Sequence, residues 1–361
     1  MVDDVSPQPF FWLPVKKQAT SICRNIFIDN TIKHDIIKYN IIKEWGWTMK
    51  KKLLTIVIAM TMISLTACGN AVDNTKKAVE TYNEAVKTYN EQAGEYITAS
   101  QATVDANEEL NSAMTAAQEV INKGEEPFDE ETLVTLKAAI STASEKQVAD
   151  PELLPVYGEV TVDENASKED LKAMKEKAES DTKAIQEVAV PDEIPEVPNY
   201  SENITAINEA KKAYEDSIQG LKQITAPTDD FVMDRLKNIE TIAEMAPVTE
   251  DHDPNGQLNK QGGYIGCIYF RDTQVDRSKL YIEKDNVIDI GTDGGGAIEV
   301  YTTKEEATSR SDYLGTFDST GFASGSHYVY GTLVIRTSNY LNGTQQKELT
   351  QKILDELIKV K

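Results

Sequence analysis

Cysteine and histidine are scarce in this chain, with three of each among 361 residues. So few cysteines exclude a framework of several disulfides. His252 and His327 are the only histidines after residue 68, and they lie far apart in sequence, which argues against a histidine-based zinc site. The chain also lacks a Gly-x-Ser-x-Gly turn, so hydrolases that depend on this turn receive no support.

Positive charge is in short supply as well, because 37 Lys and Arg residues face 60 Asp and Glu residues. Nine of the basic and five of the acidic residues precede residue 68, which leaves 28 basic and 55 acidic residues and a net charge of −27. Such a charge argues against binding to nucleic acid and against electrostatic attachment to an anionic surface. It fits a soluble exported protein that concentrates cations.

One short apolar run stands near the N-terminus, from Leu53 to Ile63. Three lysines precede it and Leu65-Thr66-Ala67-Cys68 follows it, which is the layout of a secretory signal. This motif resembles the lipobox of bacterial lipoproteins. The resemblance implies cleavage before Cys68, acylation of its thiol and anchoring on the outer face of the cytoplasmic membrane. The alternative is an uncleaved membrane anchor with a chance Leu-Thr-Ala-Cys sequence.

The sequence predicts five segments along the chain. We expect residues 1–48 to be a spurious upstream extension before a true start at Met49, although a genuine N-terminal helix is the alternative. Residues 49–67 are the expected signal peptide. A helical region over 68–247, an Asp/Asn/Gly-rich linker over 248–262 and a small α+β domain over 263–361 then follow.

The helical region opens with a heptad-like apolar pattern over residues 71–123, interrupted by polar Ser100, Thr103 and Asn107. Tyr82, Tyr89 and Tyr96 repeat within it, and we expect them to face a partner helix, with a carbohydrate-stacking ladder as the alternative. Further helices are predicted from about Asp129, over Ser167–Val188, over Ser201–Ile224 and over Thr228–Met245. Each has one apolar stripe, so the segment is predicted to form an antiparallel helical bundle or a helical stalk.

After Pro247 the helical period disappears. Strands are predicted at Tyr264–Phe270, Ala297–Tyr301 and His327–Arg336, with further strand-forming sequence at Lys279–Glu283 and Val287–Ile290. Capping signals at Thr303 and Asn342 predict two helices. The predicted order is β-β-β-α-β-α, with a right-handed crossover if the strands on either side of the first helix are parallel neighbours.

The block from about Ala226 to the C-terminus contains DHDPNGQLNKQGGY, IGTDGGGAIEVY and SGSHYVYGTLVIRTS. In these motifs it resembles an uncharacterised module of exported proteins from low-GC Gram-positive bacteria, the Firmicutes. The resemblance implies no catalytic residue.

The best metal candidate is a calcium loop that begins at Asp251. Oxygen ligands are spaced at alternate positions, and the predicted ligands are Asp251, Asp253, Asn255 and, through its backbone carbonyl, Gln257. Gly262 stands where a bidentate glutamate should close the shell, so a further carboxylate would be needed. The alternative is a structural turn.

The remaining motifs predict no catalytic residue. Gly291–Gly296 precedes a strand and lacks a following Lys-Ser/Thr pair, which favours a flexible turn over a phosphate site. Ser324 and Ser326 lie beside His327 at a strand entry, and Cys267 is predicted to be a buried thiol. We therefore expect a lipid-anchored, non-catalytic binding protein whose partner is the cell wall or a surface protein. A cell-envelope hydrolase with acidic catalytic residues and a solute-binding lipoprotein are the alternatives.

Overall fold

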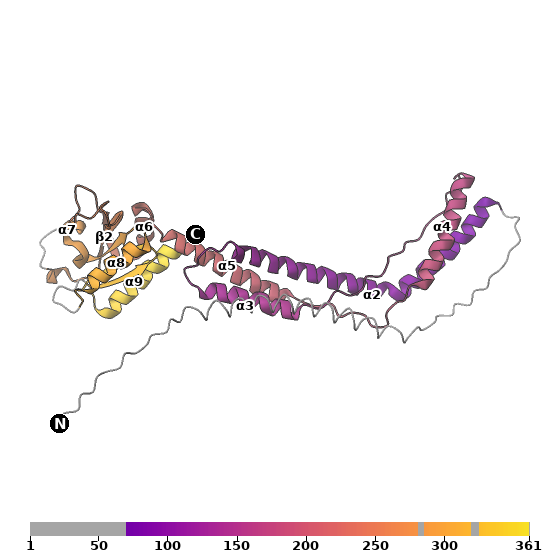
Figure 1. The fold of residues 1–361 in the computed structure, drawn as a ribbon, viewed down its shortest axis with the longest axis horizontal. Helices are drawn as coiled ribbons and strands as arrows, with labels where there is room; N and C mark the ends of the chain where they lie inside the picture. The colour runs from indigo at the N-terminus through magenta and orange to yellow at the C-terminus, as the bar shows by residue number, and fades with distance from the viewer. Residues whose placement is uncertain (1–69, 281–284, 319–324, 361) are drawn as a thin grey trace, which may run out of the picture. The chain divides into compact units, whose positions relative to one another are not determined.

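The computed structural model describes residues 70–280, 285–318 and 325–360, and Gly69–Lys361 form one compact unit. Residues 1–48, the expected signal peptide, Cys68, Ser324 and most of the predicted strand Lys279–Glu283 lie outside the described residues. The predicted class is confirmed in its broad outline, since a helical part precedes a small α+β part (Figure 1).

The helical part is built around α2 (Ala71–Asn122), whose length is about 78 Å at 1.5 Å per residue. Asn70 caps its first turn, and Gly124 in a left-handed conformation (φ +66°) follows its end. The three other helices of this part follow the predicted boundaries closely: α3 (Glu131–Lys146), α4 (Lys168–Glu187) and α5 (Ser201–Gln223). The heptad positions of α2 are buried, including polar Ser100, Thr103 and Asn107.

The direction of each helix follows from its contacts with α2. The Thr75 hydroxyl donates to the Leu171 carbonyl near the start of α4, and Tyr200, just before α5, donates to Asn107. Tyr214, farther along α5, donates to the Glu125 carbonyl beyond the end of α2. Helices α4 and α5 therefore run in the same direction as α2, and only α3 is antiparallel to it. Helix α5 is antiparallel to α3, on which it packs, as a bundle predicts. The predicted antiparallel arrangement is wrong for α4, because a long extended segment leads the chain back to the start of α2 before α4 begins.

The first of these extended segments, residues 147–167, lies along α2 in the opposite direction. The α2 tyrosines hold it by hydrogen bonds of 3.0, 2.7 and 3.0 Å from Tyr82, Tyr89 and Tyr96 to the carbonyls of Gly158, Pro155 and Glu152. Seven helical residues span about 10.5 Å, which is close to the roughly 10 Å of three extended residues. The rings of Tyr82 and Tyr89 also pack with Ala178 and Ile185 of α4, as expected for tyrosines that face a partner helix.

The α+β part begins earlier than the sequence pattern indicates. The predicted helix over Thr228–Met245 is wrong in its second half, because α6 ends at Leu236 and β1 (Ile242–Pro247) follows. Strand β1 pairs with β2, so this tertiary contact outweighs the local apolar period. The remaining elements are β2 (Gly266–Asp272), η2 (Arg277–Lys279), α7 (Val287–Ile290), η3 (Gly291–Gly294), β3 (Gly295–Val300), α8 (Lys304–Gly315), β4 (Ser326–Tyr330), β5 (Leu333–Thr337) and α9 (Gly343–Ile358).

The sheet is antiparallel throughout, in the order β1-β2-β3-β5-β4. Two strand predictions are wrong. Val287–Ile290 forms α7 because the Asn286 side chain caps a helical turn, and His327–Arg336 divides at Gly331 (φ +57°) into the hairpin of β4 and β5. The predicted order β-β-β-α-β-α is therefore wrong. From β2 onward the α-helices and strands follow the order β-α-β-α-β-β-α, and β5 lies between β3 and β4 in the sheet.

Apolar residues fill both faces of the sheet. Ile298, Val300 and Leu333 belong to the cluster that includes residues of α6 and α9, whereas Ala297, Tyr301 and Val334 belong to the cluster that includes residues of α7 and α8. The alternation along β3 turns Glu299 toward the same face as α8. This face carries the buried ion cluster around Glu299.

Candidate functional site

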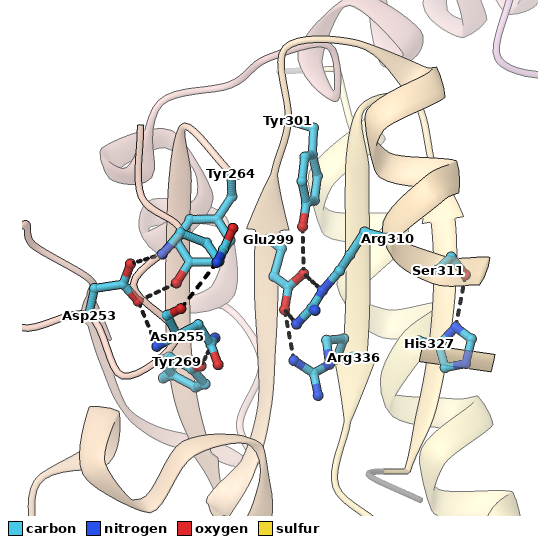
Figure 2. Close-up of polar contacts among 11 residues, drawn as sticks. Asp253, Asn255, Tyr264, Tyr269, Glu299, Tyr301, Arg310, Ser311, His327 and Arg336 are labelled. Carbon is cyan, nitrogen blue, oxygen red and sulfur yellow. Dashed lines mark hydrogen bonds and ion pairs between the residues drawn. The ribbon is translucent and has the colours of Figure 1, made fainter. Parts of the chain in front are cut away.

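A buried ion cluster lies between the sheet and α8 (Figure 2). Glu299 is completely buried and accepts hydrogen bonds from Arg310 Nε and Arg310 NH2 at 2.8 and 3.0 Å. Arg336 Nη1 donates to the same carboxylate at 2.7 Å, and the Tyr301 hydroxyl also donates to it, at 2.9 Å. The cluster joins β3, β5 and α8 through a single carboxylate.

The charge of Glu299 is maintained by its partners. Burial raises the pKa of its carboxyl, but the hydrogen bonds from Arg310 and the charges of Arg336 and Arg310 outweigh burial, and the pKa lies below its usual value. Burial, followed by the Glu299 charge, raises the pKa of Tyr301. Because every acceptor position of Glu299 is used and none is exposed, this cluster orders the fold and offers no open chemical group.

Sequence analysis missed this cluster. The available signal was one acidic residue, Glu299, at the center of the predicted strand Ala297–Tyr301, and one basic residue, Arg336, at the end of the predicted strand His327–Arg336. Such residues are rarely buried unless they are paired. Which groups pair with them depends on strand register, which the sequence pattern alone leaves open.

The Asp251 loop has a structural role that centers on Asp253. The carboxylate of Asp253 accepts hydrogen bonds from the backbone N–H groups of Asn255, Gln257 and Leu258 at 3.0, 2.6 and 2.8 Å, and from the Tyr264 hydroxyl. Burial raises the pKa of Asp253, yet the bonds from Tyr264 and the backbone outweigh it, so the pKa is lowered. The structure thus gives this carboxylate the role of fixing a turn.

The other predicted calcium ligands are placed differently. Asp251 is exposed, Asn255 donates from its side chain to the Tyr269 hydroxyl at 3.0 Å, and the Gln257 carbonyl accepts from the Lys260 N–H at 3.1 Å. Among the described residues, no three Asp, Glu, His or Cys side chains are grouped as metal ligands. Calcium binding by this loop stays a prediction.

His327 contacts a serine that the sequence pattern did not indicate. Its Nδ1 lies 2.8 Å from the Ser311 hydroxyl of α8, and its Nε2 lies 3.2 Å from the Asp318 carboxylate (Figure 2 shows the serine contact). Because a carboxylate accepts, a neutral His327 would carry its proton on Nε2, and its Nδ1 would then accept from Ser311. Of Ser324 and Ser326, which lie beside His327 in sequence, only Ser326 is among the described residues. Its hydroxyl lies 2.5 Å from the Thr337 hydroxyl and not beside the imidazole.

Of the two remaining sequence motifs, Cys267 behaves as expected, whereas Gly291–Gly296, expected to be a flexible turn, forms η3 and the first two residues of β3. Cys267 is a buried thiol with no exposure, and burial raises its pKa. Gly291 adopts a positive φ of +70°. A side chain at Gly296 would lie 2.2 Å from the Arg336 carbonyl, so this glycine permits close strand packing.

Two shallow hollows lie along the middle of α2. One is mainly apolar and is lined by Gly94, Thr98, Ala99 and Ala102 of the helix with Val197 of the extended segment 188–200 between α4 and α5. The other lies between Ala106 and the segment that leads into α5. Both are open to solvent and small residues line the first, so neither defines an enclosed ligand site.

No model of a known protein family matches this chain, and no curated protein and no solved structure is significantly similar to it. No helix among the described residues combines the length and apolar character needed to cross a bilayer.

Proposed function

We propose that the chain is a lipid-anchored protein of the bacterial cell surface that binds a partner without altering it chemically. The observation that carries this proposal is the Leu65–Cys68 motif, which ends two residues before the helix cap Asn70. An acylated Cys68 would thus place the start of α2 at the membrane surface. The helical part then separates the anchor from the α+β part along the chain.

Replacing Cys68 by serine is expected to abolish membrane attachment, because a hydroxyl in place of the thiol leaves no site for the lipid. The measurement is the partition of the full chain between membrane and soluble fractions, together with incorporation of labelled palmitate. The wild type should be labelled and sediment with membranes. A serine variant that still sediments with membranes and resists release would contradict the anchor.

The state of the polar clusters supports binding over catalysis. Glu299 is buried with all its acceptor positions in use, and Asp253 is engaged by four protein donors. Catalytic carboxylates need access to substrate. Glu299 has none, and the partly exposed Asp253 carboxylate is already engaged by its protein donors. A calcium ion at the Asp251 loop would have to displace protein donors from Asp253, so we regard it as an addition to the proposal and not as a requirement.

The second candidate is a cell-envelope hydrolase, and the contacts of His327 with Ser311 and with Asp318 favour it. A neutral imidazole that accepts from a serine hydroxyl and donates to a carboxylate can act as a general base. Ser311 would then be the nucleophile, and its replacement by alanine would abolish the activity. The solute-binding alternative ranks below both, because the described α+β part has a single sheet where two alternating βα lobes would be expected.

A further inference from the structure

Strand β4 is the last strand of the sheet, with one side paired to β5 and no strand of the described residues paired to its other side. Tyr330 and Leu333 close a two-residue hairpin turn at Gly331 and Thr332. The closing pair of such a hairpin exchanges hydrogen bonds, and bonded and non-bonded pairs alternate along an antiparallel ladder. His327 and Val329 therefore stand at non-bonded positions of this ladder, where backbone groups point away from the neighbouring strand.

The opposite side of β5 gives an independent check. The Tyr301 N–H donates to the Thr332 carbonyl and the Ser338 N–H to the Gly295 carbonyl, both at 2.9 Å. Hydrogen-bonded and non-bonded pairs alternate along the strand, so the backbone N–H and C=O groups of Val334 and Arg336 point toward β3. Their partners on β4, Val329 and His327, therefore point their own backbone groups away from β5. Within the described part of the chain, no backbone hydrogen bond reaches the N–H of His327 or Val329.

The two edges of the sheet differ in how they are protected. Strand β1 has a register shift between Ile242 and Glu244, ends in Pro247, and pairs Glu244 with Arg271 at 3.2 Å. Bulges, prolines and charges at an edge are the usual means of preventing strand addition. Strand β4, with the sequence SHYVY and an unbroken register, has neither a proline nor a lysine. Only the β4 edge is therefore suited to pairing.

Aromatic side chains accompany this open edge. Tyr328 is 46% exposed, and its ring lies 6.5 Å from that of Tyr330, which in turn lies 6.3 Å from Phe128. Cross-strand contacts with aromatic residues stabilise added strands. Four outward backbone groups at a two-residue spacing, beside an exposed tyrosine, match the backbone of another extended peptide.

The negative charge around β4 favours a basic partner. The exposed residues Glu305, Asp312 and Asp318 lie on or directly after α8, which contacts β4, and the whole chain carries a net charge of −23. A second copy would bring the same negative charge to the edge. We propose that the outer edge of β4 binds an extended, basic peptide segment of a partner protein by strand addition. This inference depends on the proposed binding function and names its surface and partner class.

The test uses the unit Gly69–Lys361 and a labelled peptide of alternating lysine and valine, with a second peptide of equal charge in which proline replaces every other valine. Binding is followed by fluorescence anisotropy at physiological salt, and amide exchange is measured at individual residues. We expect saturable binding of the first peptide only. The N–H groups of His327 and Val329 should become protected, since they acquire hydrogen bonds.

Val329→Pro removes an outward N–H that the fold does not use, and it should weaken binding about tenfold or more. Tyr328→Lys, which retains the backbone, should weaken it as well and covers the case in which the proline variant fails to fold. Ile265→Lys is the matched control, because Ile265 is 42% exposed and lies before β2, about 14 Å from β4 across the sheet. It should bind as the wild type does.

Equal binding of both peptides, or full binding by folded Val329→Pro, would overturn the inference. A dimer that Val329→Pro dissociates would assign the edge to a second copy and would also overturn it. A wrong assignment of the binding surface to β4 can be distinguished from a wrong proposed function. If Val329→Pro still attaches to cell-envelope material as the wild type does, the binding function holds and only the assignment to β4 is wrong.

Discussion

Replacing Glu299 by glutamine is expected to lower the free energy of unfolding by about 3–5 kcal/mol, because the buried Arg336 and the partly buried Arg310 lose their common anionic partner. The amide of glutamine offers one acceptor where the carboxylate offers two, and its NH2 group would face arginine donors. The measurement is urea denaturation of Gly69–Lys361 near neutral pH. Glu348→Gln, an exposed residue of α9, makes the same charge change and should stay within about 0.5 kcal/mol.

The effect of Glu299 should depend on pH with a defined sign. Its pKa is lowered in the folded protein, so its contribution is complete above the unfolded value of about 4.3 and is lost as the pH falls through the folded value. The difference between wild type and Glu299→Gln should therefore shrink in acid. A constant difference across this range, or a loss no larger than that of Glu348→Gln, would contradict the proposed role of the ion cluster.

Replacing Tyr82, Tyr89 and Tyr96 together by phenylalanine is expected to loosen the middle of the extended segment, residues 152–158, from α2. Asn83 and Asn107 continue to bond the segment on either side of this stretch. Each hydroxyl contributes a net hydrogen bond of about 1 kcal/mol, and the sum of about 3 kcal/mol corresponds to roughly a 100-fold rise in local opening. The rings remain, so α2 and α4 should stay packed. The measurement is the rate of proteolytic cleavage within the segment, compared with the unfolding transition of the whole unit.

The control for this variant is Tyr157→Phe. Tyr157 lies on the extended segment itself and contacts the Tyr89 ring edge-on at 5.2 Å, but its hydroxyl has no hydrogen bond with the described residues. Removing that hydroxyl should leave the cleavage rate unchanged. If the triple variant is cleaved no faster than Tyr157→Phe, the hydrogen bonds do not hold the segment in place.

The sequence correctly predicted the helices whose ends are set by residues close to them in the chain. The heptad pattern gives the start of α2 and its end to within one residue, and the capping boxes at Thr303 and Asn342 begin α8 and α9 as expected. Such caps satisfy backbone donors within a few residues of themselves. They need no information about distant parts of the chain.

Features that depend on distant residues were missed or misplaced. β1 has a helical apolar period, and only its pairing with β2, more than twenty residues later, makes it a strand. The contact of Ser311 with His327 requires α8 to lie on β4, and the partners of Glu299 come from two other elements. The tyrosine repeat was recognised, but its hydroxyls bond a segment that has no periodic signal of its own.

The most direct test of the central claim is one incubation of Gly69–Lys361 with cell walls of a low-GC Gram-positive bacterium that retain their attached proteins. The pellet is assayed for the protein and the supernatant for released wall fragments. We expect the protein to sediment with the walls in a saturable manner and the supernatant to contain no fragments above background. Fragments that disappear with Ser311→Ala would contradict the binding account and identify a hydrolase, and protein that stays wholly in the supernatant would contradict a partner in the envelope.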